Sequence, residues 1–161
     1  MIRTVLYDMD GLLLDTEPLW GQCMLRVAER HGIPITRERF KETTGLRIYE
    51  VTEFWSIRYP WAGAGHEPVA EEILDEIIEA SKVDATVLEG VEDSLKMLRK
   101  EGFKIGLASS SPARMIHALV EHFGFKIERQ KQITSDTGYV SNPRSMLQSN
   151  YRPVLWIARK N

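Results

Sequence analysis

Two aspartates near the start of the chain, Asp8 and Asp10, directly follow an apolar, β-branched segment, IRTVLY. Two carboxylates at the end of a buried strand can converge on one point and hold a hard cation such as Mg²⁺, which prefers oxygen ligands. One carboxylate can attack phosphorus to form an acyl phosphate, and the other can act as general acid and then as base. Gly11 permits a tight turn beside them. The simpler interpretation is a polar strand end followed by a turn.

A run of serines, Ser109 to Ser111, follows a second apolar segment, FKIGLA, and precedes Pro112. A hydroxyl group at a strand end, just before a helix N-terminus, is well placed to bind phosphate. The alternative is a cluster of helix N-cap residues. Beside the aspartate pair we favour phosphate binding.

The elements that position these residues alternate along the chain. Residues 2–8 and 103–109 read as short buried strands, because they are apolar runs rich in β-branched residues. A helix ending at Gly102, a helix opened by Pro112 and ending at Gly124, and a weak strand at 132–135 complete the order. This order predicts an α/β fold with a parallel, doubly wound, Rossmann-like sheet. In such sheets, ligands bind outside the carboxyl ends of the strands.

Only helical signals occupy residues 16–85. Apolar residues at helical spacing predict helices around 20–28, 48–55 and 69–78, and Phe40 marks a short additional segment. Four helical segments between one strand and the next indicate an inserted helical domain. We therefore expect an α/β core of residues 1–15 and 86–161, with a helical insertion of residues 16–85.

Composition excludes several classes of protein. The chain has 161 residues, a formal charge of −2 and 43% apolar residues, which is typical of a globular domain. The near-neutral charge gives no reason to expect a nucleic-acid partner, and no apolar run approaches the length of a membrane span. The single cysteine, Cys23, excludes an internal disulfide and fits a helix core. The N-terminus does not read as a secretory signal, so a soluble cytoplasmic protein is expected.

The stretch DMDGLLLDTE closely resembles the first motif of the haloacid dehalogenase superfamily of phosphatases. Further stretches, TTGLRI, RYPWAGAG, LEGVEDSLKMLRKEGFKIGLASSSP and HFGF, resemble its β-phosphoglucomutase-like branch. Within that branch the likeness is to bacterial phosphatases acting on 2-deoxyglucose 6-phosphate and hexitol phosphates. It covers most of residues 1–125 and implies a core with a helical cap inserted after the first strand.

The resemblance implies roles for individual residues. Asp8 resembles the nucleophile and would also hold Mg²⁺. Asp10 resembles the general acid and base, and its backbone carbonyl would also touch the metal. Ser109, with Ser110 beside it, resembles the hydroxyl group that binds the transferring phosphoryl group.

In the cap, Arg47 resembles the residue that meets the non-reacting end of the substrate. Trp20 and Glu17 would shape the sugar pocket. An exposed surface arginine and ordinary aromatic packing are the alternative interpretations of Arg47 and Trp20.

The C-terminal part departs from the family pattern. Asn142 stands before Pro143 where the family has a lysine that would neutralise phosphate charge. Asparagine can donate a hydrogen bond to the phosphate but carries no charge. No acidic residue follows Asp136, so the acid of the family's fourth motif is absent. Without the family's fourth strand, strand 2–8 would be an exposed sheet edge, although PVLWIAR has the composition of a helix or strand. We interpret the core as incomplete at the C-terminus, in a truncated chain or in a short, divergent member that closes its site by dimerising.

The resemblance implies a Mg²⁺-dependent phosphatase of small hexose or hexitol phosphates that works through an aspartyl-phosphate intermediate. A phosphosugar mutase is the alternative enzyme. The alternative of another class is a catalytically impaired remnant that only binds a ligand or a partner chain. The expected partner is a small phosphorylated sugar, and the expected state is a monomer or weak dimer.

Overall fold

A computed structural model describes residues 4–43, 45–127 and 154–157. The chain divides into two compact units. The first unit combines residues 1–15 with residues 86–161, and the second consists of residues 16–85. Each unit is described by itself.

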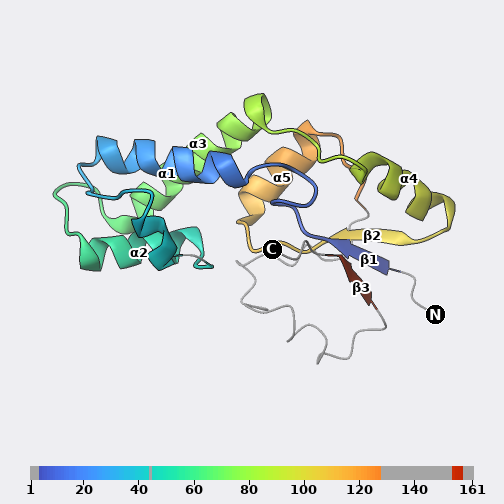
Figure 1. Ribbon diagram of the computed structural model, residues 1–161, viewed down its shortest axis with the longest axis horizontal. Helices are drawn as coiled ribbons and strands as arrows, with labels where there is room; N and C mark the ends of the chain where they lie inside the picture. The colour runs from blue at the N-terminus through green and yellow to red at the C-terminus, as the bar shows by residue number, and fades with distance from the viewer. Residues whose placement is uncertain (1–3, 44, 128–153, 158–161) are drawn as a thin grey trace. The chain divides into compact units, whose positions relative to one another are not determined.

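The first unit contains a parallel sheet of three strands, β1 (Thr4–Tyr7), β2 (Lys104–Leu107) and β3 (Val154–Ile157). The strand order is β2-β1-β3, with β1 in the centre (Figure 1). In β1 the side chains alternate, so that Val5 and Tyr7 are buried, as expected for the pleat of a strand. The two strands predicted at 2–8 and 103–109 are thus confirmed, with shorter bounds.

Strand β3 forms in the tail segment PVLWIAR, for which the sequence predicted either a helix or a strand. It pairs with β1 in parallel, with Thr4 opposite Val154 and Tyr7 opposite Ile157. Strand β1 therefore has a hydrogen-bonding neighbour on each side, which corrects the expectation that it would form an exposed edge. The weak strand predicted at 132–135 lies outside the described residues.

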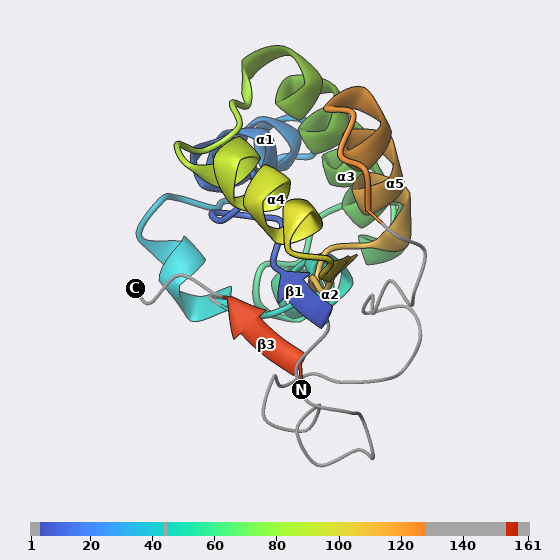
Figure 2. The same cartoon turned by 90° about the vertical axis from the view of Figure 1, so that its right-hand side faces the viewer.

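Two helices belong to the first unit, α4 (Val91–Lys100) and α5 (Ala113–His122). Helix α4 packs against β2, and the two lie next to each other in Figure 1. Figure 2 shows β3 beside β1. The Tyr7 hydroxyl group also forms a hydrogen bond with Ser94 of α4. This contact ties the helix to the strand that ends just before Asp8. Pro112 is the N-cap of α5 rather than a first-turn residue, a shift of one position that leaves the predicted helix in place.

The second unit is entirely helical. It contains α1 (Glu17–Arg30), a 3₁₀ helix η1 (Arg39–Thr43), α2 (Ile48–Arg58) and α3 (His66–Asp84). Helix α3 packs against both α1 and α2. Its buried side chains, at the spacing of one helix face, are Val69, Ala70, Ile73, Leu74, Ile77, Ile78 and Ser81. The four predicted helical segments are present, the short one as a 3₁₀ helix.

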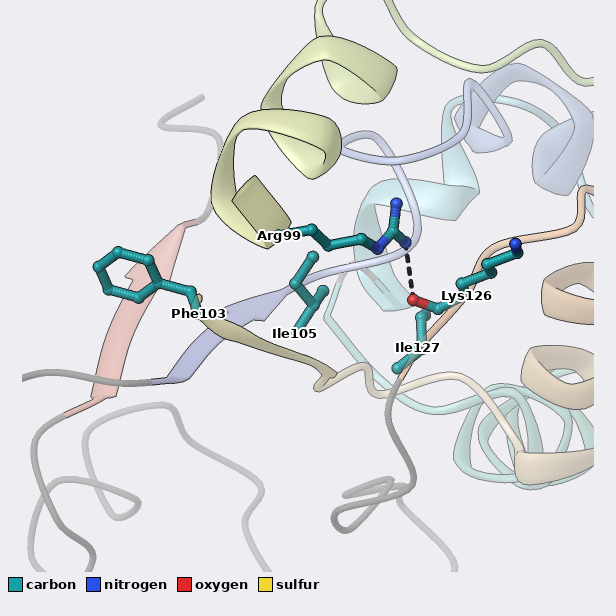
Figure 3. A pocket seen from close by; sticks show the side chains of 5 residues that line it. All are labelled: Arg99, Phe103, Ile105, Lys126 and Ile127. Carbon is teal, nitrogen blue, oxygen red and sulfur yellow. Dashed lines mark hydrogen bonds between the residues drawn. The ribbon is translucent and has the colours of Figure 1, made fainter. Parts of the chain in front are cut away.

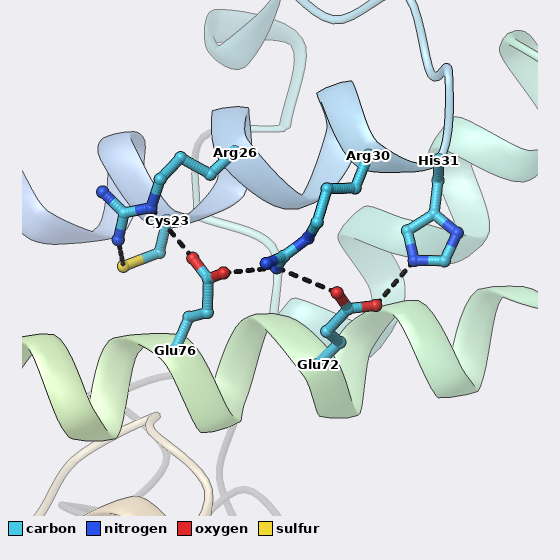
Figure 4. A network of polar contacts seen from close by, with 6 residues as sticks. All are labelled: Cys23, Arg26, Arg30, His31, Glu72 and Glu76. Carbon is cyan, nitrogen blue, oxygen red and sulfur yellow. Dashed lines mark hydrogen bonds and ion pairs between the residues drawn. The ribbon is translucent and has the colours of Figure 1, made fainter.

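Ion pairs join α1 to α3, which run antiparallel (Figure 4). The Arg26 guanidinium lies 3.1 Å from Glu76, and His31 Nε2 lies 2.6 Å from Glu72. Because these side chains are partly exposed, each pair contributes only about 0–1 kcal/mol. Cys23, which is fully buried in α1, confirms the predicted core position, and burial raises the pKa of its thiol. Apolar packing between α1 and α3 therefore stabilises the second unit more than these ion pairs do.

None of the helices in the described part of the chain is long and apolar enough to cross a membrane.

Candidate active site

The sheet register brings Asp8 and Ser109 to one edge. Tyr7 at the end of β1 is paired with Leu107 at the end of β2. One residue further on, the Ala108 N–H donates to the Tyr7 carbonyl oxygen at 2.8 Å. Asp8 follows Tyr7 and Ser109 follows Ala108, so both lie just beyond the ends of the two parallel strands. This is the carboxyl edge of the sheet, where α/β folds bind their ligands.

The turn after β1 is built around Met9, whose side chain is 1% exposed. Its carbonyl oxygen accepts hydrogen bonds from the N–H groups of Leu13 and Leu14, both at 3.0 Å. Gly11 has a φ of 69°, a conformation that glycine adopts without steric cost. The buried methionine anchors the turn and holds Asp8 and Asp10 on either side of it.

The electrostatic environment of Asp8 disfavours its charge. Burial raises the pKa of Asp8 to about 6, and the negative charge of Asp10 contributes to the rise. Hydrogen bonds from the Met9 N–H, 2.7 Å from Asp8 Oδ1, and from the Ser109 hydroxyl group oppose it. A carboxylate that is desolvated beside a second carboxylate is stabilised by a cation.

The serines after β2 differ in environment. Ser109 and Ser111 are buried, whereas Ser110 is exposed. The Ser111 N–H donates to Ser109 Oγ at 3.1 Å, and the Ser111 hydroxyl donates to Asp10 Oδ2 at 2.5 Å. The structure thus links the serine run to both aspartates. Only two of the three serines lie inward.

Two donors at this site were missed from the sequence. The Met9 N–H is a backbone group, which a side-chain motif does not reveal. Ser111 was assigned no role of its own. The chain bends at Ser110 and Ser111, so the alternation of side chains along a strand does not indicate which of the serines faces inward.

The residues expected to meet the sugar belong to the second unit. Glu17 is exposed in the first turn of α1, and Trp20 is half-buried one turn later. Arg47 is half-buried at the N-cap of α2, where its backbone N–H donates to Glu50 Oε2 at 2.8 Å. Asn142, expected near the phosphate, lies outside the described residues.

The donor set suits a divalent cation in part. Asp8 and Asp10 supply carboxylate oxygens, the ligands that Mg²⁺ prefers. In the described part of the chain, no group of three or more His, Cys, Asp or Glu side chains gathers at one point. Two carboxylates are therefore the side-chain donors that this region offers to a metal.

A hollow of about 220 Å³ lies elsewhere in the first unit (Figure 3). Arg99, Phe103, Ile105, Lys126 and Ile127 line it. Phe103 precedes β2 and Ile105 lies within it, whereas Asp8 follows the parallel strand β1, so the lining residues do not include the strand end that carries the aspartates. None of its lining residues is one that the sequence predicted for the site.

Comparison with known proteins agrees with the fold. The family model of haloacid dehalogenase-like hydrolases matches residues 2–148. The chain therefore belongs to this family, as its first motif suggested.

Two relatives and one solved structure illustrate the likeness. Hexitol phosphatase B of Escherichia coli K12 is 34% identical over 126 residues, which are 78% of this chain and 57% of that protein. A phosphorylated carbohydrates phosphatase of Thermotoga maritima is 28% identical over 120 residues, covering 70% of this chain and 52% of the relative. A β-phosphoglucomutase structure from Clostridium difficile superposes with a TM-score of 0.63 at 23% identity, covering 92% and 70% of the two chains.

The chain spans about half the length of the curated relatives it matches. These relatives are named as phosphatases of phosphorylated carbohydrates. Because the solved structure is only 23% identical to this chain, its likeness supports the fold alone.

Proposed function

We propose that the chain carries the site of a phosphatase that hydrolyses small hexose or hexitol phosphates. The observation that supports this most is the gathering of Asp8, Asp10, Ser109 and Ser111 at the carboxyl edge of the sheet. A nucleophilic carboxylate, a second carboxylate and a phosphate-binding hydroxyl are what acyl-phosphate chemistry requires. The named activities of the relatives favour a phosphorylated sugar as substrate.

In the proposed reaction, an Asp8 carboxylate oxygen attacks phosphorus as the bond from phosphorus to the sugar oxygen breaks. Asp10 delivers its proton to that oxygen, and the sugar alcohol leaves. Water then attacks the aspartyl phosphate while Asp10 takes its proton. The bond from Asp8 to phosphorus breaks, which releases inorganic phosphate and restores the Asp8 carboxylate. The Ser109 hydroxyl donates to an oxygen of the transferring group throughout.

Mg²⁺ is the proposed cofactor, and the Asp8 carboxylate and the Asp10 backbone carbonyl would hold it. When bound, the ion supplies positive charge that neutralises the phosphate and favours the ionised form of Asp8. We propose in addition that the second unit serves as the cap and selects the sugar through Arg47, Trp20 and Glu17.

The test is phosphate release by the purified chain from a panel of hexose and hexitol phosphates, with and without Mg²⁺. Asp8→Asn removes the nucleophile, so we expect its rate to fall by at least about 10³-fold. Asp15→Asn is the matched control, because Asp15 is an exposed aspartate that ends the same turn, and its rate should stay within about two-fold of the parent.

Three results would contradict the proposal or part of it. Equal rates for the parent and Asp8→Asn would exclude Asp8 as the nucleophile. A folded parent that releases no phosphate from any substrate would favour the impaired remnant. An isomerised sugar phosphate among the products would favour the mutase.

A further inference from the structure

Ser111 contacts the second aspartate directly, across 101 residues of sequence. Its hydroxyl group lies 2.5 Å from Asp10 Oδ2. A carboxylate only accepts hydrogen bonds, so the serine is the donor. Hydrogen bonds to ionised groups are short and about twice as strong as those between neutral groups. The contact therefore restrains the plane of the Asp10 carboxyl group.

The position of Ser111 is itself fixed by the fold. Its side chain is 6% exposed, and its N–H donates to Ser109 Oγ. Pro112 follows, and proline restricts the backbone conformation of the residue before it. Pro112 in turn caps α5, whose first turn buries Met115 and Ile116. The hydroxyl group thus projects from a rigid strand-to-helix junction.

We propose that Ser111 is a positioning residue for the general acid and base of the reaction. By binding Oδ2, Ser111 sets the orientation in which Asp10 meets the leaving sugar oxygen. Accurate placement of a catalytic group accounts for large factors in rate, and small displacements are costly. The proposal rests on the proposed function, because it takes Asp10 to be that acid and base.

The dependence of the rate on the leaving group distinguishes this role from a contact with substrate. A hexitol alkoxide is a poor leaving group that needs a proton from Asp10, whereas 4-nitrophenolate leaves without one. We expect Ser111→Ala to lower kcat on sorbitol 6-phosphate by about 10- to 100-fold, with KM within about two-fold of the parent value. On 4-nitrophenyl phosphate kcat should change by less than about three-fold.

Two further variants complete the set. Ser111→Thr keeps the hydroxyl group and should restore kcat on sorbitol 6-phosphate to within about five-fold of the parent value. Ser94→Ala is the matched control, because it removes a serine hydroxyl that binds Tyr7 in the same unit. In Ser94→Ala, the ratio of kcat on sorbitol 6-phosphate to kcat on 4-nitrophenyl phosphate should equal the parent ratio.

Two kinetic results would overturn the inference. A raised KM at unchanged kcat would place Ser111 on the substrate itself. Equal losses of kcat on both substrates, without rescue by threonine, would leave Ser111 a merely structural role.

A second measurement, the ¹³C resonance of the Asp10 carboxyl carbon at one fixed pH, does not depend on turnover. We expect it to move in Ser111→Ala, to return towards the parent position in Ser111→Thr, and to stay in place in Ser94→Ala. If the parent is active and this resonance does not move in Ser111→Ala, the inference about Ser111 is wrong while the proposed function stands. A parent inactive on both substrates overturns the proposed function, and the resonance then decides by itself whether Ser111 holds Asp10.

Discussion

At the scale of single residues, Asp8 links reactivity to stability. Its pKa is raised from an ordinary 3.8 to about 6, chiefly by burial. The folded chain therefore retains the proton of Asp8 to higher pH than the unfolded chain does. Between about pH 4 and pH 6 the folded state binds more protons, so stability falls as pH rises through this window. A shift of this size corresponds to about 3 kcal/mol.

We therefore predict that Asp8→Asn stabilises the metal-free chain at pH 7.5, by roughly 1–3 kcal/mol in the free energy of unfolding. The neutral amide carries no charge to desolvate. Urea denaturation of parent and variant in chelator at pH 4 and pH 7.5 would measure this, and the difference should shrink towards zero at pH 4. The exposed Asp15→Asn should show no comparable difference. A variant that is less stable than the parent at pH 7.5 would contradict this view of Asp8.

Asp8, Asp10 and Ser109 were predicted as site residues because they lie at the ends of apolar strands and within stretches that resemble the family's motifs, a signal contained in a few neighbouring positions. The contact between Ser111 and Asp10 was not predictable in that way. It depends on the register of β1 against β2, which pairs Tyr7 with Leu107, and a single sequence does not specify register. The motif also did not predict which of the three serines would be buried, because their exposure depends on how the backbone turns at each residue.

At the scale of elements, α3 organises the second unit. It packs against both α1 and α2, and Ile73 on its inner face is fully buried. Val83, near the end of the same helix, is 81% exposed. One helix thus offers two β-branched apolar residues in opposite environments.

These two positions provide a matched pair. Ile73→Ala removes buried methylene and methyl groups and leaves a cavity, so we expect it to lower the free energy of unfolding by about 2–5 kcal/mol. Val83→Ala removes exposed methyl groups and should change that free energy by less than about 0.5 kcal/mol. Chemical denaturation followed by far-ultraviolet circular dichroism would compare them. Similar losses in both variants would mean that α3 does not bury the face described here.

Helix existence was easier to predict than helix limits. The apolar residues of α3 repeat at helical spacing, so its presence follows from the sequence. Its start at His66, well before the first apolar residue of the pattern, depends on Gly65 as N-cap and was not evident. The tail strand β3 was left undecided, because a short apolar run suits either a helix or a strand until a sheet edge is available to pair with it.

At the scale of the whole molecule, the sheet joins the two ends of the chain. Strand β1 lies near the N-terminus and β3 near the C-terminus, and they pair along Thr4–Tyr7. The strand that carries Asp8 therefore depends on the tail for one of its two neighbours. An unpaired strand edge presents free N–H and C=O groups that bind other chains.

Deleting residues 153–161 removes β3 and should expose the edge of β1. We expect the shortened chain to be less stable than the parent, because the hydrogen-bond ladder between β1 and β3 is lost, and to self-associate through the new edge. Analytical ultracentrifugation over a concentration series, combined with urea denaturation, would measure both effects. The control deletes residues 158–161, which follow β3, and should match the parent. A deletion of 153–161 that remains monomeric with unchanged stability would show that β1 does not rely on the tail.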